Sequence, residues 1–144
     1  FSYNEIRNFN LFKSSDASLI YARILDAKLP SFSENVSLVL HYNQALLDLM
    51  DDWEDIEEDI KEDMPNVFVM AAIENVPYKI IKKYNVTKLR NAILNSLESS
   101  KSPIIRLVDE YYASIRNISI PSNLVFIKLL SHHHAETLRQ AISS

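Results

Sequence analysis

Residues 48 to 59 read Asp48-Leu-Met-Asp51-Asp52-Trp53-Glu54-Asp55-Ile56-Glu57-Glu58-Asp59, and no Lys or Arg lies between Lys28 and Lys61. Successive residues of an α-helix are rotated by about 100°, so positions 48, 52, 55 and 59 fall within a sector of roughly 60°. The stretch therefore predicts a helix that carries a line of four aspartates along one edge.

An apolar stripe runs beside the aspartates on the same helix. It consists of Tyr42, Leu46, Leu49, Trp53, Ile56 and Ile60, and its centre lies about 110° from the line of carboxylates. We expect the helix to extend from Ser33 to Asp63. Ser31-Phe-Ser-Glu34 has the pattern of a capping box at its start, and Met64-Pro65-Asn66 ends or kinks it. One edge of this helix is predicted to be core, and the adjacent edge is acidic.

The line of aspartates has two interpretations. The first is a solvated acidic face. Against it, Asp is a poor helix former, and like charges three or four residues apart destabilise a helix by roughly 0.2–0.5 kcal/mol per pair. The second is a site for a hard cation, because Mg²⁺ takes oxygen ligands and often combines one or two carboxylates with phosphate oxygens and water. On this second interpretation the metal ligands are drawn from Asp48, Asp51, Asp52, Asp55 and Asp59.

The composition restricts the class of protein. A chain of 144 residues is long enough for one domain with its own core, and we treat residues 1–144 as a single domain. Hydrophobic residues make up 47%, and the formal charge of -4 gives no sign of disorder or of a general nucleic-acid interface. The absence of Cys and Gly excludes disulfides, thiolate sites and glycine-rich phosphate loops. With no membrane-spanning apolar run and no signal-peptide pattern, we expect a cytoplasmic protein.

The pattern of residues predicts an all-α helical bundle of five or six helices, with Pro residues as punctuation. A weak helical pattern covers residues 3–12. A second helix is expected from Ser14 or Ser15 to about Ala27, and we expect it to bury Leu19, Ile20, Ile24 and Leu25. Residues 67–73 are apolar all round, which is typical of a buried helix. Thr87, Ser102-Pro103 and Pro121-Ser122 are expected to start three further packing helices.

Several basic residues are candidates for binding an anion. Lys13 lies just before the expected start of a helix, where free N–H groups favour negative charge. Lys79 and Lys82 lie together on a short helical stretch, where they either meet a diphosphate or extend over the core as lysines commonly do. By contrast, His132, His133 and His134 occupy three consecutive helical positions that point in different directions. We expect these histidines to be at the surface or partly buried.

The segment from Gln44 to Asp59 resembles the second aspartate-rich motif of the trans-prenyl diphosphate synthases and the wider class I isoprenoid synthases. In that family Asp-Asp-x-x-Asp lies on a long helix, often with a Gln shortly before it. The resemblance implies that Asp51 or Asp52, together with Asp55, holds Mg²⁺, with Asp48 and Asp59 as supporting acids. Lys13-Ser14-Ser15 lies roughly where the family has a Lys-Thr pair that contacts diphosphate. The similarity covers residues 11–81.

The resemblance implies a bundle like the C-terminal half of such a synthase, and a reaction in which Mg²⁺ assists loss of diphosphate from an allylic prenyl diphosphate, leading to prenyl transfer or chain elongation. The family also has a first aspartate-rich motif, which faces the second one across the cavity. We expect it upstream of Phe1, unless the chain is a short, divergent member. The alternative is a non-catalytic helical subunit or interaction domain, in a homo- or hetero-oligomer, whose acidic helix contacts a basic partner.

Overall fold

The computed structural model describes residues 1–28, 34–73, 77–97 and 102–143, apart from the side chains of residues 18, 21, 22, 25–28, 86, 96, 97 and 143. Within these ranges the chain is helical and contains no strand, which confirms the predicted all-α fold. The α-helices are α1 (Tyr3–Lys13), α2 (Ser15–Lys28), α3 (Glu34–Glu54), α4 (Ile56–Lys61), α5 (Val67–Ala72), α6 (Tyr78–Ile81), α7 (Val86–Leu97), α8 (Pro103–Asn117) and α9 (Val125–Ser143), and a 3₁₀ helix, η1 (Ser122–Leu124), precedes α9.

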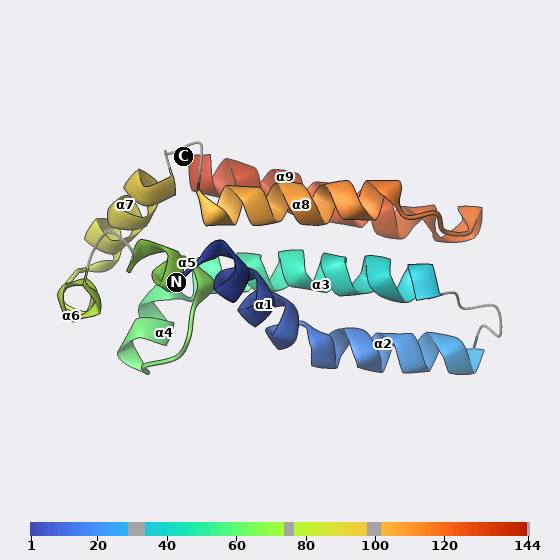
Figure 1. Ribbon diagram of the computed structural model, residues 1–144, viewed down its shortest axis with the longest axis horizontal. Helices are drawn as coiled ribbons and strands as arrows, with labels where there is room; N and C mark the ends of the chain where they lie inside the picture. Colours follow the sequence, from blue (N-terminus) through green and yellow to red (C-terminus); the bar gives the residue numbers. More distant parts are fainter. Residues whose placement is uncertain (29–33, 74–76, 98–101, 144) are drawn as a thin grey trace.

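Helix α3 is the centre of the arrangement. Helix α2 packs along one side of it, and the antiparallel pair α8 and α9 packs along the other, while the shorter helices α4 to α7 gather at its C-terminal end (Figure 1). Helix α1 crosses α3 and also contacts α5 and α8. None of the helices in the described ranges is long and apolar enough to span a membrane.

The predicted apolar stripe of the acidic helix is core. Leu46, Leu49, Trp53, Ile56 and Ile60 are buried, and Tyr42 packs against them. Helix α5 is buried through Val67, Phe68, Val69, Ala71 and Ala72, as its composition predicts. The Trp53 and Phe68 rings lie 5.1 Å apart between their centres. This core fixes which edge of α3 remains for its polar residues.

The long acidic helix is broken, contrary to the prediction of one helix to Asp63. Helix α3 ends at Glu54, and α4 begins at Ile56 after Asp55, whose φ is -92° and ψ 7°. The guanidinium of Arg90 donates to the carbonyls of Trp53 and Glu54 at 3.5 Å. Those carbonyls would accept from the N–H groups of residues 57 and 58 in a continuous helix. After α4 the chain turns at Asp63 with a φ of 56°, a left-handed conformation that Asp tolerates better than most residues.

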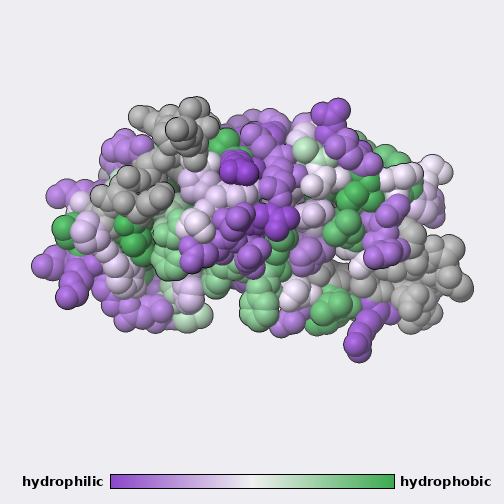
Figure 2. Space-filling model, in the orientation of Figure 1, coloured by the Kyte–Doolittle hydropathy of each residue, from purple (hydrophilic) through white to green (hydrophobic). Residues whose placement is uncertain are grey.

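Helix α2 forms where it was predicted, but the prediction for its buried face is wrong. Leu19, Ile20 and Ile24 are 56%, 58% and 55% exposed. In helix α9, which was expected to be a packing helix, the apolar residues Val125, Leu129 and Leu130 are also exposed, as is Phe126. Figure 2 shows apolar side chains among hydrophilic ones on one face of the molecule. The periodicity correctly identified these helices but not what covers them.

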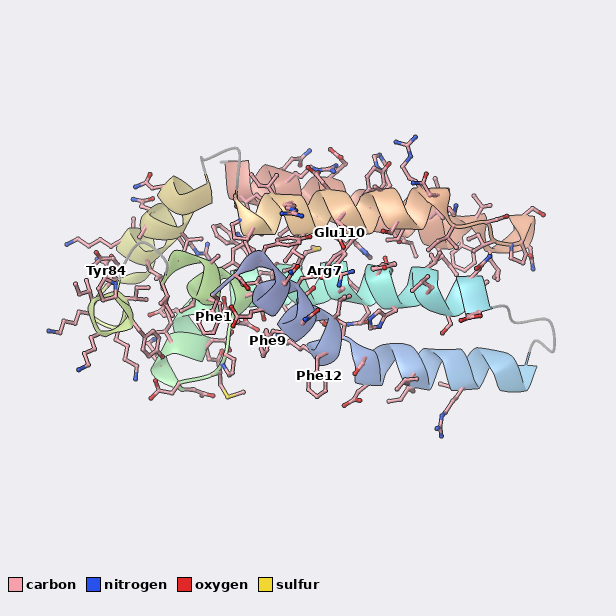
Figure 3. The ribbon with its side chains drawn as sticks, viewed as in Figure 1. Phe1, Arg7, Phe9, Phe12, Tyr84 and Glu110 are labelled. Atoms are coloured by element: carbon pink, nitrogen blue, oxygen red, sulfur yellow. The ribbon has the colours of Figure 1, made fainter. Side chains whose placement is uncertain are left out.

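The helix ends combine predicted and unpredicted caps. Pro103 starts α8 after Ser102, as predicted. Near the start of α7 it is Asn85, and not Thr87, whose side chain accepts the Lys88 N–H. The expected cap at residues 31–33 lies outside the described residues. At the other end of the chain, α1 is tied to α8 because Arg7 Nε donates to Glu110 at 2.5 Å (Figure 3).

Candidate functional site

The corner between α1 and α2 brings two side chains to the acidic edge of α3. Helix α1 ends at Lys13 and α2 begins at Ser15. The Lys13 ammonium forms an ion pair with Asp52. The Ser14 hydroxyl donates to Asp48 at 2.5 Å, and the Gln44 amide donates to the other oxygen of Asp48 at 2.9 Å. The structure therefore joins a predicted anion-binding residue to a predicted metal ligand.

Asn66 ties the acidic edge to the buried helix α5. Its side-chain oxygen caps α5 by accepting from the N–H groups of Phe68 and Val69. Its amide nitrogen donates to the Asp52 carbonyl at 2.6 Å and to Asp59 at 2.8 Å. The pattern Met64-Pro65-Asn66 predicts only the end of a helix. The signal for the cap is that Asn66 stands directly before an apolar helical run.

Asp52 is the most deeply buried of the candidate ligands, with only 1% of its surface exposed. One oxygen accepts from the Val67 N–H at 2.9 Å, and the other pairs with Lys13. Burial raises the pKa of Asp52, and the hydrogen bonds from Lys13 and Val67 offset this only in part. Asp52 thus depends on its two donors to remain ionised in the interior.

The pKa of Lys13 is raised as well. Its burial lowers the pKa, but the hydrogen bond to Asp52 and the charges of Asp48 and Asp59 outweigh that effect. The two partners differ in their contact with water, because the Asp52 carboxylate is buried whereas the Lys13 side chain is 39% exposed. Lys13 is accordingly a charged group that solvent and a ligand can reach.

Asp51 and Asp55 differ from the buried aspartates because both side chains are exposed. Within the described part of the chain no hydrogen bond or ion pair engages either carboxylate. The pKa of Asp51 is raised, first by partial burial and then by the charge of Asp48, with smaller contributions from Asp55 and Glu54 that Lys13 partly offsets. These two acids lie in a region with excess negative charge.

The residues fit Mg²⁺ only if a second ligand completes the site. The described residues contain no group of three or more His, Cys, Asp or Glu side chains placed to hold a metal ion. Asp48 and Asp52 already accept from protein donors, which leaves the oxygens of Asp51 and Asp55. Because Mg²⁺ is commonly bound by one or two carboxylates together with substrate phosphates and water, this donor set suits a shared ion and not an ion held by protein alone.

The other predicted anion-binding residues lie away from this edge. Lys82 pairs with Asp63 in the turn after α4. That hydrogen bond lowers the pKa of Asp63. Lys79 is exposed on α6. Of the three histidines, His132 and His133 are exposed and His134 is partly buried, as predicted.

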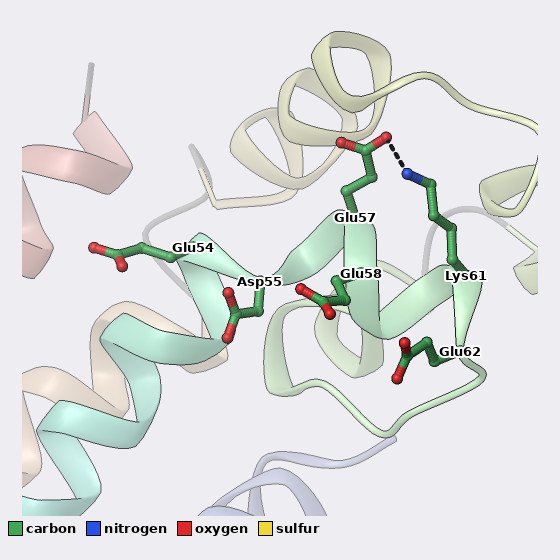
Figure 4. Close-up of a pocket in the computed structure, with 6 residues that line it drawn as sticks. All are labelled: Glu54, Asp55, Glu57, Glu58, Lys61 and Glu62. Carbon is green, nitrogen blue, oxygen red and sulfur yellow. Dashed lines mark ion pairs between the residues drawn. The ribbon is translucent and has the colours of Figure 1, made fainter.

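Two hollows flank the region. The first, of about 430 Å³, lies at the break between α3 and α4 and is lined by Glu54, Asp55, Glu57, Glu58, Lys61 and Glu62 (Figure 4). Within it Lys61 pairs with Glu57 at 2.8 Å. The second, of about 340 Å³, is mainly apolar, with Phe9, Met64, Val69 and Met70 among its lining residues. Asn66 also lines this second hollow.

Comparison of the chain with protein-family models, with curated proteins and with solved structures found no match.

Proposed function

We propose that this chain binds Mg²⁺ together with a prenyl diphosphate at the edge of α3, as its resemblance to the class I isoprenoid synthases implies. The supporting observation is the meeting of Lys13 with Asp52, next to Asp51, whose carboxylate interacts with the charges of both Lys13 and Asp55. Lys13 and Asp52 are 39 residues apart and were assigned from separate patterns in the sequence. A site for a metal diphosphate needs a cation that solvent can reach and unpaired carboxylates near it. Asp51 interacts electrostatically with Lys13 on one side and with Asp55 on the other.

Each residue has a distinct role in this proposal. Asp51 and Asp55 hold the metal, since their oxygens are exposed and have no protein donor in the described part of the chain. Asp48, Asp52 and Asp59 position the edge through Ser14, Val67 and Asn66. Lys13 exchanges its bond with Asp52 for one with a phosphate oxygen. When bound, Mg²⁺ supplies positive charge that neutralises the leaving diphosphate.

The apolar hollow favours a prenyl group over a bare diphosphate. It is lined by aromatic, aliphatic and methionine side chains, which suit a hydrocarbon chain. Asn66 connects it to the acidic edge, because this residue both lines the hollow and hydrogen-bonds Asp52 and Asp59. The class of reaction proposed for this site is prenyl transfer, as the resemblance to the isoprenoid synthases implies.

Calorimetric titration tests the proposal. Mg²⁺ alone should bind weakly, whereas Mg²⁺ with inorganic pyrophosphate should bind more tightly, and Mg²⁺ with geranyl diphosphate more tightly still. Asp51→Asn combined with Asp55→Asn should remove the binding of both metal diphosphates. Glu57→Gln combined with Glu62→Gln is the matched control, because it removes two exposed acids that are not assigned to the metal. Equal binding by both double variants, or no binding of either mixture, would refute the proposal.

A second function is favoured by the acidic hollow itself. Five of its six lining residues are acids, around the single cation Lys61. That surface suits a basic segment of another protein, and the chain would then be a non-catalytic subunit. A lysine-rich peptide should bind in a salt-sensitive way and lose affinity when Glu57, Glu58 and Glu62 are changed together to Gln. This triple variant should leave the binding of Mg²⁺ with pyrophosphate unchanged, so the two functions can be separated.

A further inference from the structure

Helix α2 exposes a face that has both apolar residues and charges of opposite sign. It contacts α3 along one side and α1 at its start. Leu19, Ile20 and Ile24 are more than half exposed, and Asp16 and Arg23 lie on the same exposed face. At about 100° per residue, Asp16 and Arg23 fall within roughly 20° of each other, with Leu19 on one flank and Ile20 and Ile24 on the other. We call these five residues the α2 face.

We propose that the α2 face binds the α2 face of a second copy of this chain, with the two helices antiparallel. A two-fold axis passing between Leu19 and Ile20 places Asp16 of each copy level with Arg23 of the other, because both residues are equally far from the axis along the helix. The rise of about 1.5 Å per residue separates the two charges by about 10.5 Å on one helix. The contact is then self-complementary, with two identical ion pairs around a central apolar contact, as a two-fold interface requires.

The apolar surface continues from α2 onto α3. Leu19 and Leu38 line a hollow of about 310 Å³ between the two helices, and Leu38 is exposed. A side chain from the second copy can enter this hollow next to the central contact. The proposed interface is therefore wider than a single helix, which a stable dimer needs.

The exposed part of α9 does not offer the same match. Val125, Phe126, Leu129 and Leu130 are exposed there, but residues 125–134 include Lys128 and no acid. Two copies joined through this part of α9 would bring lysines together without a carboxylate to pair them. The charge pattern therefore favours α2 as the surface between copies.

Charge reversal tests both the interface and its antiparallel register. The native chain should sediment as a dimer, and Asp16→Arg or Arg23→Asp alone should raise the dissociation constant by about tenfold or more, because each turns two attractions into two repulsions. The two single variants mixed together should form a heterodimer, and the double variant Asp16→Arg with Arg23→Asp should again form a homodimer. Lys83→Glu, which reverses an exposed charge on another part of the molecule, should leave the dimer unchanged.

The outcomes distinguish the proposal from its alternatives. Circular dichroism should show the same helix content in every variant, since these side chains are exposed in the single chain. A native chain that remains monomeric at sub-millimolar concentration overturns the proposal. So does a dimer that withstands both single reversals. Single reversals that dissociate the dimer without rescue by mixing or by the double variant would refute the antiparallel register.

Discussion

The ion pair between Lys13 and Asp52 gives a prediction about stability that depends on pH. Lys13→Met keeps a side chain of similar length and removes the charge. It leaves the carboxylate of Asp52, which is 1% exposed, with the backbone N–H of Val67 as its remaining donor. Breaking a fully buried ion pair costs about 3–5 kcal/mol. Because the Lys13 side chain is 39% exposed and water can partly replace it, we reduce the expected loss to about 2 kcal/mol.

The sign of the pH dependence follows from Asp52. Its pKa in the folded protein lies above the unfolded value because of burial, and loss of Lys13 raises it further. The folded state then binds the proton more tightly than the unfolded state, so the free energy of unfolding falls as the pH rises between the two pKa values. The variant should therefore lose most stability at neutral pH and recover part of it in acid, where Asp52 is protonated.

Urea unfolding followed by the fluorescence of Trp53, the only tryptophan, measures this effect. Trp53 is buried next to Asp52 and should report the transition. At pH 7 a loss of about 2 kcal/mol corresponds to a melting temperature about 4–8 °C lower. Adding Asp52→Asn to Lys13→Met should restore part of the loss, because no buried charge is left unpaired. A loss that is equal at neutral and acid pH, or that Asp52→Asn does not relieve, would refute the reasoning.

Two further predictions concern other contacts. Asn66→Ala removes the α5 cap and the hydrogen bonds to Asp52 and Asp59, so the free energy of unfolding in urea should fall by about 3 kcal/mol. The control Asn85→Ala removes one exposed cap and should lower it by about 1 kcal/mol. Equal losses would contradict the role given to Asn66. Burial and the hydrogen bond to Glu110 raise the pKa of Tyr3 to about 12, so the stability from this contact should be complete below pH 10 and lost as the pH rises through 12. Absorbance titration of the native chain against Tyr3→Phe measures that pKa, and a difference spectrum centred near pH 10 would contradict it.

The sequence predicted those parts of the fold that depend on local pattern. The stripe from Leu46 to Ile60 is core, and α5 is buried, because both patterns follow the helical period and contain only residues that gain from burial. The break at Asp55 could not be predicted in this way. It accompanies the contact of Arg90 with the carbonyls of Trp53 and Glu54. That contact depends on where α7 is held by its packing against α5, α8 and α9.

The arrangement of the candidate site residues follows the helical spacing only in part. Helical spacing predicts that Asp48, Asp52, Asp55 and Asp59 lie on one line, and Asp48 and Asp52 do share the edge that meets Lys13 and Ser14. However, the break in the helix separates Asp55 from that line and leaves it in the acidic hollow. Which aspartate is held by protein donors and which is exposed depends on donors at the end of α1 and at the start of α5. The spacing within residues 48–59 does not contain that information.

The α2 face also shows what a sequence pattern cannot predict. The apolar period of Leu19, Ile20 and Ile24 correctly indicates a surface that gains from leaving water, but the described helices of one chain leave it exposed. A periodic pattern predicts that a face is buried against a partner, but it does not predict which molecule supplies that partner. The spacing of Asp16 and Arg23 adds that missing information, because opposite charges placed symmetrically about the apolar centre match a second copy of the same face. The contact should therefore respond to charge reversal at these two positions more strongly than to the same change elsewhere on the surface.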